Sequence, residues 1–119
     1  AMASTETVSQ TLRAELRRAA DSQGTKAEDA LVALSDGPML ERLEAAMRAL
    51  AAHRGRTSST CPSDVARSVG GDRWRELMDD TRATARRLAA AGVVEITQRG
   101  SVVDPNDDWR GPVRIRIAG

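Results

Sequence analysis

The chain has 119 residues, the length of one small domain or of one domain with an extension. It contains no Phe or Tyr, two Trp, and 17 Arg against a single Lys, so its core has to be built from aliphatic side chains. The formal net charge of +1 excludes a strong overall attraction to nucleic acid. The charge is uneven: residues 1–37 carry four basic and six acidic side chains (net −2), and residues 38–119 carry 14 basic and 11 acidic ones (net +3).

Cysteine content and hydropathy predict the compartment. The single cysteine, Cys61, cannot form an intrachain disulfide, and no disulfide framework points to export. No apolar run approaches the roughly 20 residues that a membrane-spanning helix needs. The N-terminus also lacks the apolar core of a signal peptide. We therefore expect a soluble, cytoplasmic protein with no membrane partner.

The N-terminal part of the chain shows two thin helical stripes. Residues 4–24 place Val8, Leu12 and Leu16 at helical spacing, and Gly24 is suited to end that helix. Thr25-Lys26-Ala27-Glu28 matches a capping box, which predicts the start of a second helix. Helices this short are marginal alone. Residues 1–37 are thus predicted to be a helical extension that packs on the main domain, packs on a second subunit, or is partly disordered.

The main domain, residues 38–119, is predicted to begin with helices. The first segments are a helix from Pro38 to about His53 that Gly55 ends, a possible edge strand over Arg56–Thr60, a helix from Pro62 to Gly70-Gly71, and a helical turn around Trp74. A further helix is predicted over Thr81–Ala91, with Asp79 or Asp80 as its cap. Gly92 is suited to end it.

The C-terminal residues alternate as strands do. Val93–Gln98 is a predicted strand, Arg99-Gly100 a tight turn, and Ser101–Val103 the returning strand. Residues 113–117 alternate strictly, which places Arg114 and Arg116 together on a solvated face. The predicted fold class is mainly α with a small β-hairpin or sheet, a winged helix-turn-helix with an N-terminal helical extension.

Several separated motifs resemble one known family. They are Cys61-Pro62-Ser63-Asp64-Val65-Ala66-Arg67, Trp74-Arg75-Glu76-Leu77-Met78, and the segments Thr97–Gly100, Val103–Pro105 and Arg110–Arg116. In this order they resemble the domain-of-unknown-function family numbered 3253, a set of small bacterial proteins with a winged-helix-like fold. The resemblance covers residues 39–118. It implies the fold and implies no activity.

DNA binding is the first functional hypothesis. On the helix Thr81–Ala91, Arg82 and Arg86 lie one turn apart among small alanines, so their guanidinium groups could contact guanine edges or phosphates in a major groove. The candidate DNA-binding residues are Ser63, Arg67, Arg82, Arg86, Arg87 and Arg99. The alternative is a merely solvated face in an arginine-rich protein.

The predicted wing, residues 99–112, argues against strong binding. It carries Arg99 and Arg110 against three aspartates, a net charge of −1, whereas phosphate contacts need basic side chains. The wing is expected either to contribute little or to fold its acidic side chains onto the domain's own arginines.

A non-catalytic protein-interaction module is the second hypothesis, with a homodimer formed through residues 4–34. Trp109 lies in a polar loop, where an exposed Trp is a candidate interaction anchor. The alternative is that Trp109 folds back and covers the aliphatic core. A winged-helix fold by itself does not choose between these functions.

Catalysis is not expected. The chain has one His and one Cys, with no spaced metal-ligand cluster, phosphate loop or paired nucleophile and base. We expect no metal, no cofactor and no small-molecule ligand. Cys61 precedes a predicted helix N-terminus, a setting that can activate a thiol, and is a weak redox candidate. The alternative is a small buried residue beneath the turn.

Overall fold

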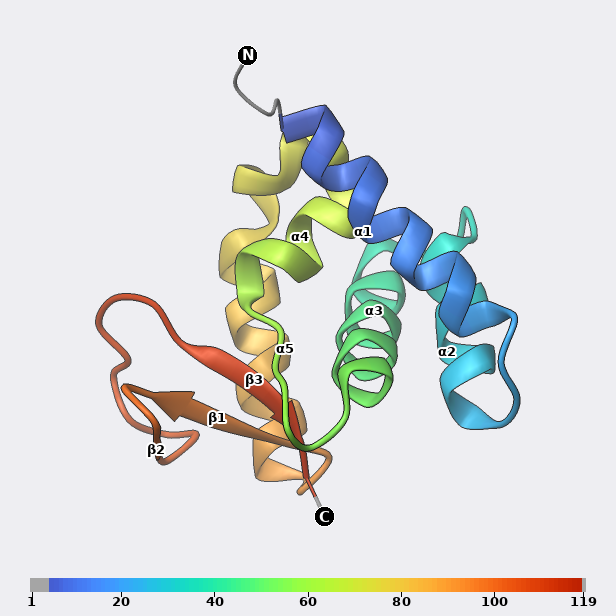
Figure 1. Ribbon diagram of the computed structural model, residues 1–119. Helices are drawn as coiled ribbons and strands as arrows, with labels where there is room; N and C mark the ends of the chain where they lie inside the picture. The colour runs from blue at the N-terminus through green and yellow to red at the C-terminus, as the bar shows by residue number, and fades with distance from the viewer. Residues whose placement is uncertain (1–4, 119) are drawn as a thin grey trace.

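Helices form the N-terminal part of the chain and strands the C-terminal part (Figure 1). The computed structural model describes residues 5–118; residues 1–4 and 119, which the predicted domains 1–37 and 38–119 include, lie outside the described residues. In chain order the elements are α1 (Thr5–Ala20), α2 (Thr25–Leu34), α3 (Met39–Arg54), α4 (Pro62–Gly70), the 3-10 helix η1 (Gly71–Leu77), α5 (Met78–Ala90), β1 (Val94–Gln98), β2 (Ser101–Val102) and β3 (Arg114–Ile117). This mainly helical chain with a small antiparallel sheet is compatible with the predicted winged-helix fold.

The helix α1 packs against α3 and α4, and α2 packs against α1 and α3 (Figure 1). Their buried apolar residues are Leu12, Leu16, Ala19, Ala27, Ala30 and Ala33. Leu16 and Ala30 belong to the same core cluster as Leu50 of α3. Of the outcomes that the sequence left open for the extension, the described part therefore shows packing on the main domain.

The start of α2 differs from the predicted capping box. Gly24, with φ 84° and ψ −160°, occupies the cap position, and its carbonyl accepts hydrogen bonds from the amides of Ala27 (3.1 Å) and Glu28 (3.2 Å). No side chain caps the helix. The prediction of Thr25 as the cap was wrong because glycine adopts this left-handed backbone without strain and leaves Thr25 as the first helical residue.

The central helix α3 carries three of the large, fully buried side chains of the core. Leu43, Met47 and Leu50 are fully buried along one side of it. As predicted, Gly55 ends the helix with φ 73°, and its amide bonds to the carbonyl of Ala51 at 3.1 Å. Pro62 opens α4, where its missing amide proton costs nothing.

The connection between α4 and α5 is a separate 3-10 helix, as the predicted turn around Trp74 indicated. The predicted cap at Asp79 or Asp80 was wrong, because α5 follows η1 directly at Met78, with helical backbone angles and no side-chain cap hydrogen bond. Asp79 and Asp80 instead lie in the first turn of α5. There their negative charges suit the positive end of the helix dipole without a capping hydrogen bond.

The sheet has the order β2-β1-β3 and is antiparallel throughout. Arg99 (φ 53°) and Gly100 (φ 84°) both have positive φ, which matches the tight turn predicted between β1 and β2. The predicted strand over Arg56–Thr60 is reduced to one bridge, in which Thr60 and Ile115 exchange two hydrogen bonds of 2.8 Å. Residues 99–112, the wing, connect β1 to β3 through β2 and a long loop.

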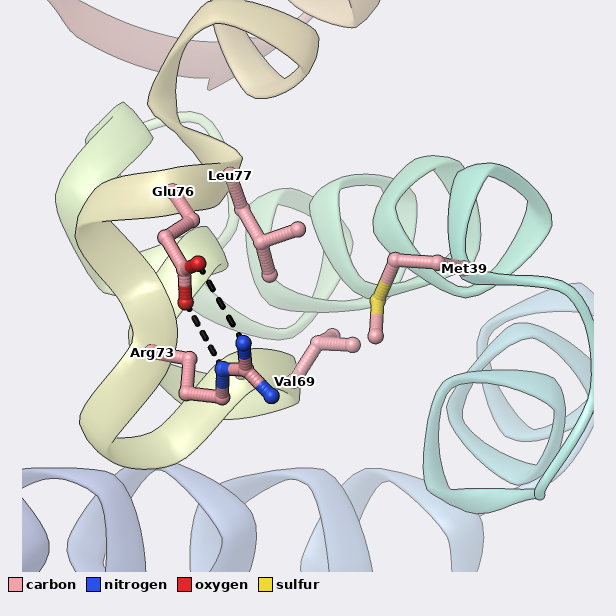
Figure 2. Close-up of a pocket in the computed structure, with 6 residues that line it drawn as sticks. Met39, Val69, Arg73, Glu76 and Leu77 are labelled. Atoms are coloured by element: carbon pink, nitrogen blue, oxygen red, sulfur yellow. Dashed lines mark hydrogen bonds and ion pairs between the residues drawn. The ribbon is translucent and has the colours of Figure 1, made fainter.

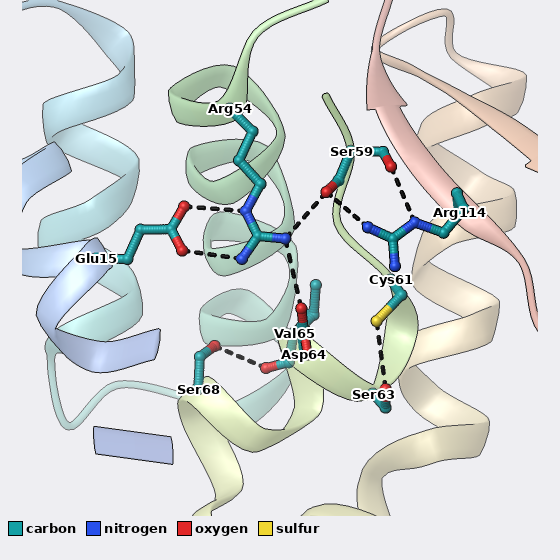
Figure 3. A network of polar contacts seen from close by, with 9 residues as sticks. All are labelled: Glu15, Arg54, Ser59, Cys61, Ser63, Asp64, Val65, Ser68 and Arg114. Atoms are coloured by element: carbon teal, nitrogen blue, oxygen red, sulfur yellow. Dashed lines mark hydrogen bonds and ion pairs between the residues drawn. The ribbon is translucent and has the colours of Figure 1, made fainter. Parts of the chain in front are cut away.

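Arg54, at the end of α3, joins four parts of the fold (Figure 3). Its guanidinium donates two hydrogen bonds to the carboxylate of Glu15 on α1, at 3.0 and 2.9 Å. Nη1 also donates to the carbonyl of Ser59 (3.0 Å) and to Asp64 of α4 (3.4 Å). Arg114 of β3 donates to that carbonyl and to the hydroxyl of Ser59, both at 2.9 Å. The hydrogen bonds from Arg54 lower the pKa of Glu15, although burial opposes them.

We expect Glu15→Gln to lower the free energy of unfolding by about 1–3 kcal/mol at neutral pH, because the variant loses a half-buried charged pair. The pKa of folded Glu15 lies below its ordinary value of 4.5. The stabilisation is therefore complete above pH 4.5 and is lost as the pH falls through the folded pKa. Urea unfolding of both chains at neutral and acidic pH measures this.

The matched control is Glu41→Gln, an exposed carboxylate of α3 without a hydrogen bond or ion pair to any of residues 5–118. It should lower the free energy of unfolding by no more than about 0.3–1 kcal/mol at neutral pH, because it loses only the interaction of its charge with the N-terminal end of α3. A Glu15→Gln deficit of the same size at both pH values would contradict the assignment.

Candidate nucleic-acid interface

The helix α5 contains three of the six residues predicted to contact DNA, namely Arg82, Arg86 and Arg87. Thr81, Thr84, Ala85 and Leu88 are buried and fix the helix against the core. Its exposed side chains are Asp79, Asp80, Ala83, Arg87 and Ala90. The solvent-facing stripe is therefore acidic at its start and small along its middle, and Arg87 is its one exposed cation.

Arg82 and Arg86 point into the wing. Nη2 of Arg82 donates to the carbonyl of Trp109 at 2.9 Å. Nη1 of Arg86 donates to the carbonyls of Pro105 (2.7 Å) and Asp107 (2.5 Å). The guanidinium of Arg86 also stacks on the Trp109 ring, 4.0 Å from its centroid. These two arginines therefore hold the wing on α5.

Trp109 is only 5% exposed and belongs to the hydrophobic core cluster. Its indole Nε1 donates to the carbonyl of Asp104 at 3.0 Å, which satisfies the one polar atom of the ring. The residue is thus the core cover that the sequence left as an alternative, and it is not exposed as an interaction anchor.

The wing folds onto the arginines through carbonyl oxygens rather than through its carboxylates. The Asp104 carboxylate accepts from the amide of Asn106 at 2.7 Å, and that of Asp108 contacts Arg110 at 3.5 Å. Carbonyls are neutral, so they fix the guanidinium groups of Arg82 and Arg86 without cancelling their charge. The junction of α5 and the wing therefore keeps two positive charges in fixed positions.

Arg87 and Arg67 also have partners within the chain. Arg87 forms an ion pair with Glu44 of α3 at 3.2 Å and keeps 57% of its side chain exposed. The guanidinium of Arg67 lies 4.1 Å from the centroid of the Trp74 ring, and its buried Nε lacks a hydrogen-bond partner among the described residues. Arg87 is thus free to exchange partners, whereas Arg67 is partly enclosed by Trp74 of η1.

Of the remaining candidates, Ser63 lines a hollow together with Met78 and Arg82 of α5, and Cys61 lines it as well. Arg99 is exposed at the β1–β2 turn. Ser63 and Cys61 flank the start of α4, with the hydroxyl of Ser63 3.3 Å from the Cys61 sulfur (Figure 3). Cys61 is a free cysteine and is half-buried. The structure therefore places Ser63 beside Arg82 of α5, whereas Arg67 stacks on Trp74 and Arg99 lies at the β1–β2 turn.

The candidate list did not include three arginines at the sheet. Arg56, Arg110 and Arg114 are exposed around the strands β1 and β3. The sequence did indicate that Arg114 is exposed, because the alternation of residues 113–117 placed it on a solvated face. Arg56 and Arg110 lie in loops, where no periodicity indicates which face a side chain joins.

A hollow of 320 Å³ lies beside the 3-10 helix η1 (Figure 2). Met39, Val69 and Leu77 give it apolar walls, and its polar groups at the rim are Arg73 and Glu76, which pair with each other at 2.7 Å. The side-chain hydrogen bond from Arg73 lowers the pKa of Glu76. Because the rim charges satisfy one another, the lining offers little to orient a polar ligand.

Residues 40–118 match the family described as "Protein of unknown function (DUF3253)". The chain belongs to this family. The DUF3253 match begins in the first turn of α3 and leaves α1 and α2 outside it, in agreement with the resemblance over residues 39–118. No curated protein matches the chain. The family description states no activity, so function has to be argued from the geometry.

The structure describes residues 5–118 of this DUF3253 chain. No helix in that range is long and apolar enough to cross a membrane. Within the same range, His, Cys, Asp and Glu side chains do not gather in groups of three suited to a metal ion.

We expect Arg86→Gln to lower the free energy of unfolding by about 1–3 kcal/mol, because two carbonyls lose a charged donor and Trp109 loses its stacking partner. Arg87→Gln is the matched control, with the same change one residue along α5. It removes one exposed ion pair and should cost no more than about 0.5 kcal/mol. Denaturant unfolding followed by circular dichroism measures both. Equal losses would show that Arg86 does not secure the wing.

Proposed function

We propose that this chain is a non-catalytic module that binds double-stranded DNA through the side on which α5 meets the wing. The observation that carries the proposal is the state of Arg82 and Arg86. Both are held by carbonyl oxygens, and neither forms an ion pair with a carboxylate among the described residues. Fixed, uncompensated cations attract phosphates and release the counterions condensed on DNA.

The shape of α5 suits a groove. Its 13 residues span about 20 Å, and the small side chains of Ala83 and Ala90 let the helix backbone approach another surface closely. A B-DNA major groove about 12 Å wide admits such a helix. Arg82 and Arg86 are fixed by the wing and cannot extend to base edges, so they supply attraction to phosphates. We therefore expect binding with little sequence preference, because phosphate contacts carry no sequence information.

A charge placed on the exposed stripe of α5 tests this arrangement. We expect Ala83→Glu to weaken binding to a fluorescently labelled duplex, because a carboxylate would face the phosphates. Ala83→Gln, which adds the same bulk without charge, should bind nearly as the original chain does. Gln10→Glu on the exposed side of α1 gives the same charge change far from α5 and should also leave binding unchanged. Fluorescence anisotropy across a salt series measures all four chains.

Each result decides a different part of the proposal. An original chain without salt-dependent binding would overturn DNA binding itself. Binding that Ala83→Glu and Gln10→Glu weaken equally would overturn the role of α5, because only the overall charge would then matter.

Homodimerisation without DNA is the second candidate. The apolar stripes of α1 and α2 pack internally, so the predicted dimer through residues 4–34, of which residue 4 lies outside the described residues, has to use another surface of the same helices. Leu31 and Val32 of α2 and Met39 and Leu40 of α3 are exposed on either side of one turn. Leu31 is 59% exposed and Leu40 is 56% exposed. A group of exposed apolar side chains favours contact with another protein surface more than single scattered ones do.

We expect, on this second candidate, a dimer by light scattering that Leu31→Gln with Leu40→Gln converts to a monomer. The double substitution leaves the buried side of both helices intact, whereas removal of α1 and α2 would open the core around Leu16 and Ala30. A monomeric original chain at high concentration would contradict self-association.

A further inference from the structure

The outer face of the sheet is the surface of β1 and β3 opposite the buried Ile96 and Ile115. Two hollows of 370 and 130 Å³ lie on it and share Thr97. The arginines that line them are Arg99, Arg110 and Arg114 in the larger hollow and Arg56 and Arg116 in the smaller one. No carboxylate is among their lining residues in the described part of the chain.

Charge on the outer sheet face is only partly compensated. Arg116 is paired with Glu95 at 3.0 Å, and Arg110 contacts Asp108 at 3.5 Å with both side chains almost fully exposed, which makes that pair weak. Five arginines against these two carboxylates leave a net charge of +3. Arg56 and Arg99 form no hydrogen bond or ion pair with any residue in the range 5–118.

The backbone around these arginines is held in place. Arg114 is fixed by the hydroxyl and carbonyl of Ser59, whose carbonyl Arg54 also binds (Figure 3). The side-chain amide of Gln98 donates to the carbonyls of Arg110 (2.6 Å) and Pro112 (3.3 Å), so the wall of the larger hollow is tied to β1. The hydroxyl and carbonyl of Ser59 are neutral partners, so the positive charge of Arg114 stays uncancelled.

We infer that the outer sheet face binds the phosphodiester backbone of duplex DNA. The inference rests on the proposed function and names a contact surface for the same partner. Arginine is suited to it because the planar guanidinium forms two parallel hydrogen bonds with a phosphate. The two hollows extend from the turn at Arg99 to the loop at Arg56, so the cations form a row rather than one isolated site. A row of this kind matches a polymer of phosphates.

The test removes the two arginines that have no contact to lose. Arg56→Gln with Arg99→Gln should keep the fold and lower the salt dependence of binding to a labelled duplex. Each lost phosphate contact reduces the slope of log K against log salt by about 0.9, so we expect a reduction of about 1.8. The control is Arg17→Gln with Arg18→Gln, which removes the same charge from exposed positions on α1. This control variant should keep the slope of log K against log salt that the original chain has.

The outcomes separate the two proposals. A chain that does not bind duplex DNA at all overturns the proposed function and, with it, this inference. A chain that binds, but whose slope is unchanged in the Arg56/Arg99 variant or falls equally in the control, keeps the proposed function and overturns the outer sheet face as the contact. Ala83→Glu reports on α5 independently of either result.

Discussion

The stacking of Arg86 on Trp109 fixes the position of the wing, and the C-terminal half of the fold depends on it. The wing loop around Asp104–Asp108 is polar and cannot bury enough apolar surface to offset the entropy of ordering it. Trp109 supplies the one large apolar side chain of that loop, and Arg86 covers its ring while binding two loop carbonyls. A chain with no Phe or Tyr has few other means of attaching a long loop to a helix.

In the N-terminal half another arginine, Arg54, also joins separate elements, but its partners are negatively charged. Arg54 joins α1, α3 and α4 through the carboxylates of Glu15 and Asp64, so its charge is compensated where it lies. Arg82, Arg86 and Arg114 are instead held by carbonyl and hydroxyl oxygens, which cancel no charge. The distinction between carboxylate and neutral partners therefore separates arginines that only stabilise the fold from those whose charge remains available to a partner.

Local signals in the sequence were enough to predict most of the elements. Pro62, Gly55 and Gly92 mark helix ends through their own backbone preferences, and Arg99-Gly100 marks a turn for the same reason. The errors at Thr25 and Asp79 arose where a side chain suited to capping stood next to backbone that made a cap unnecessary. The hydrogen bonds from Arg86 to the wing could not be predicted. Their acceptors lie some 20 residues away and are main-chain carbonyls, which carry no sequence signature.

The same distinction bears on where DNA would contact the chain. A recognition helix needs mobile cations on its exposed stripe, and α5 offers Arg87 there beside the acidic Asp79 and Asp80. The outer sheet face offers Arg56 and Arg99, which are exposed and engaged with no other described side chain, next to the anchored Arg114. Electrostatic attraction falls off within roughly one Debye length, about 8–10 Å at physiological salt, so nearby uncancelled charges matter more than the overall +1. A nearly neutral chain can thus attract a polyanion when most of its acidic side chains lie on the helices and its sheet keeps an excess of arginine.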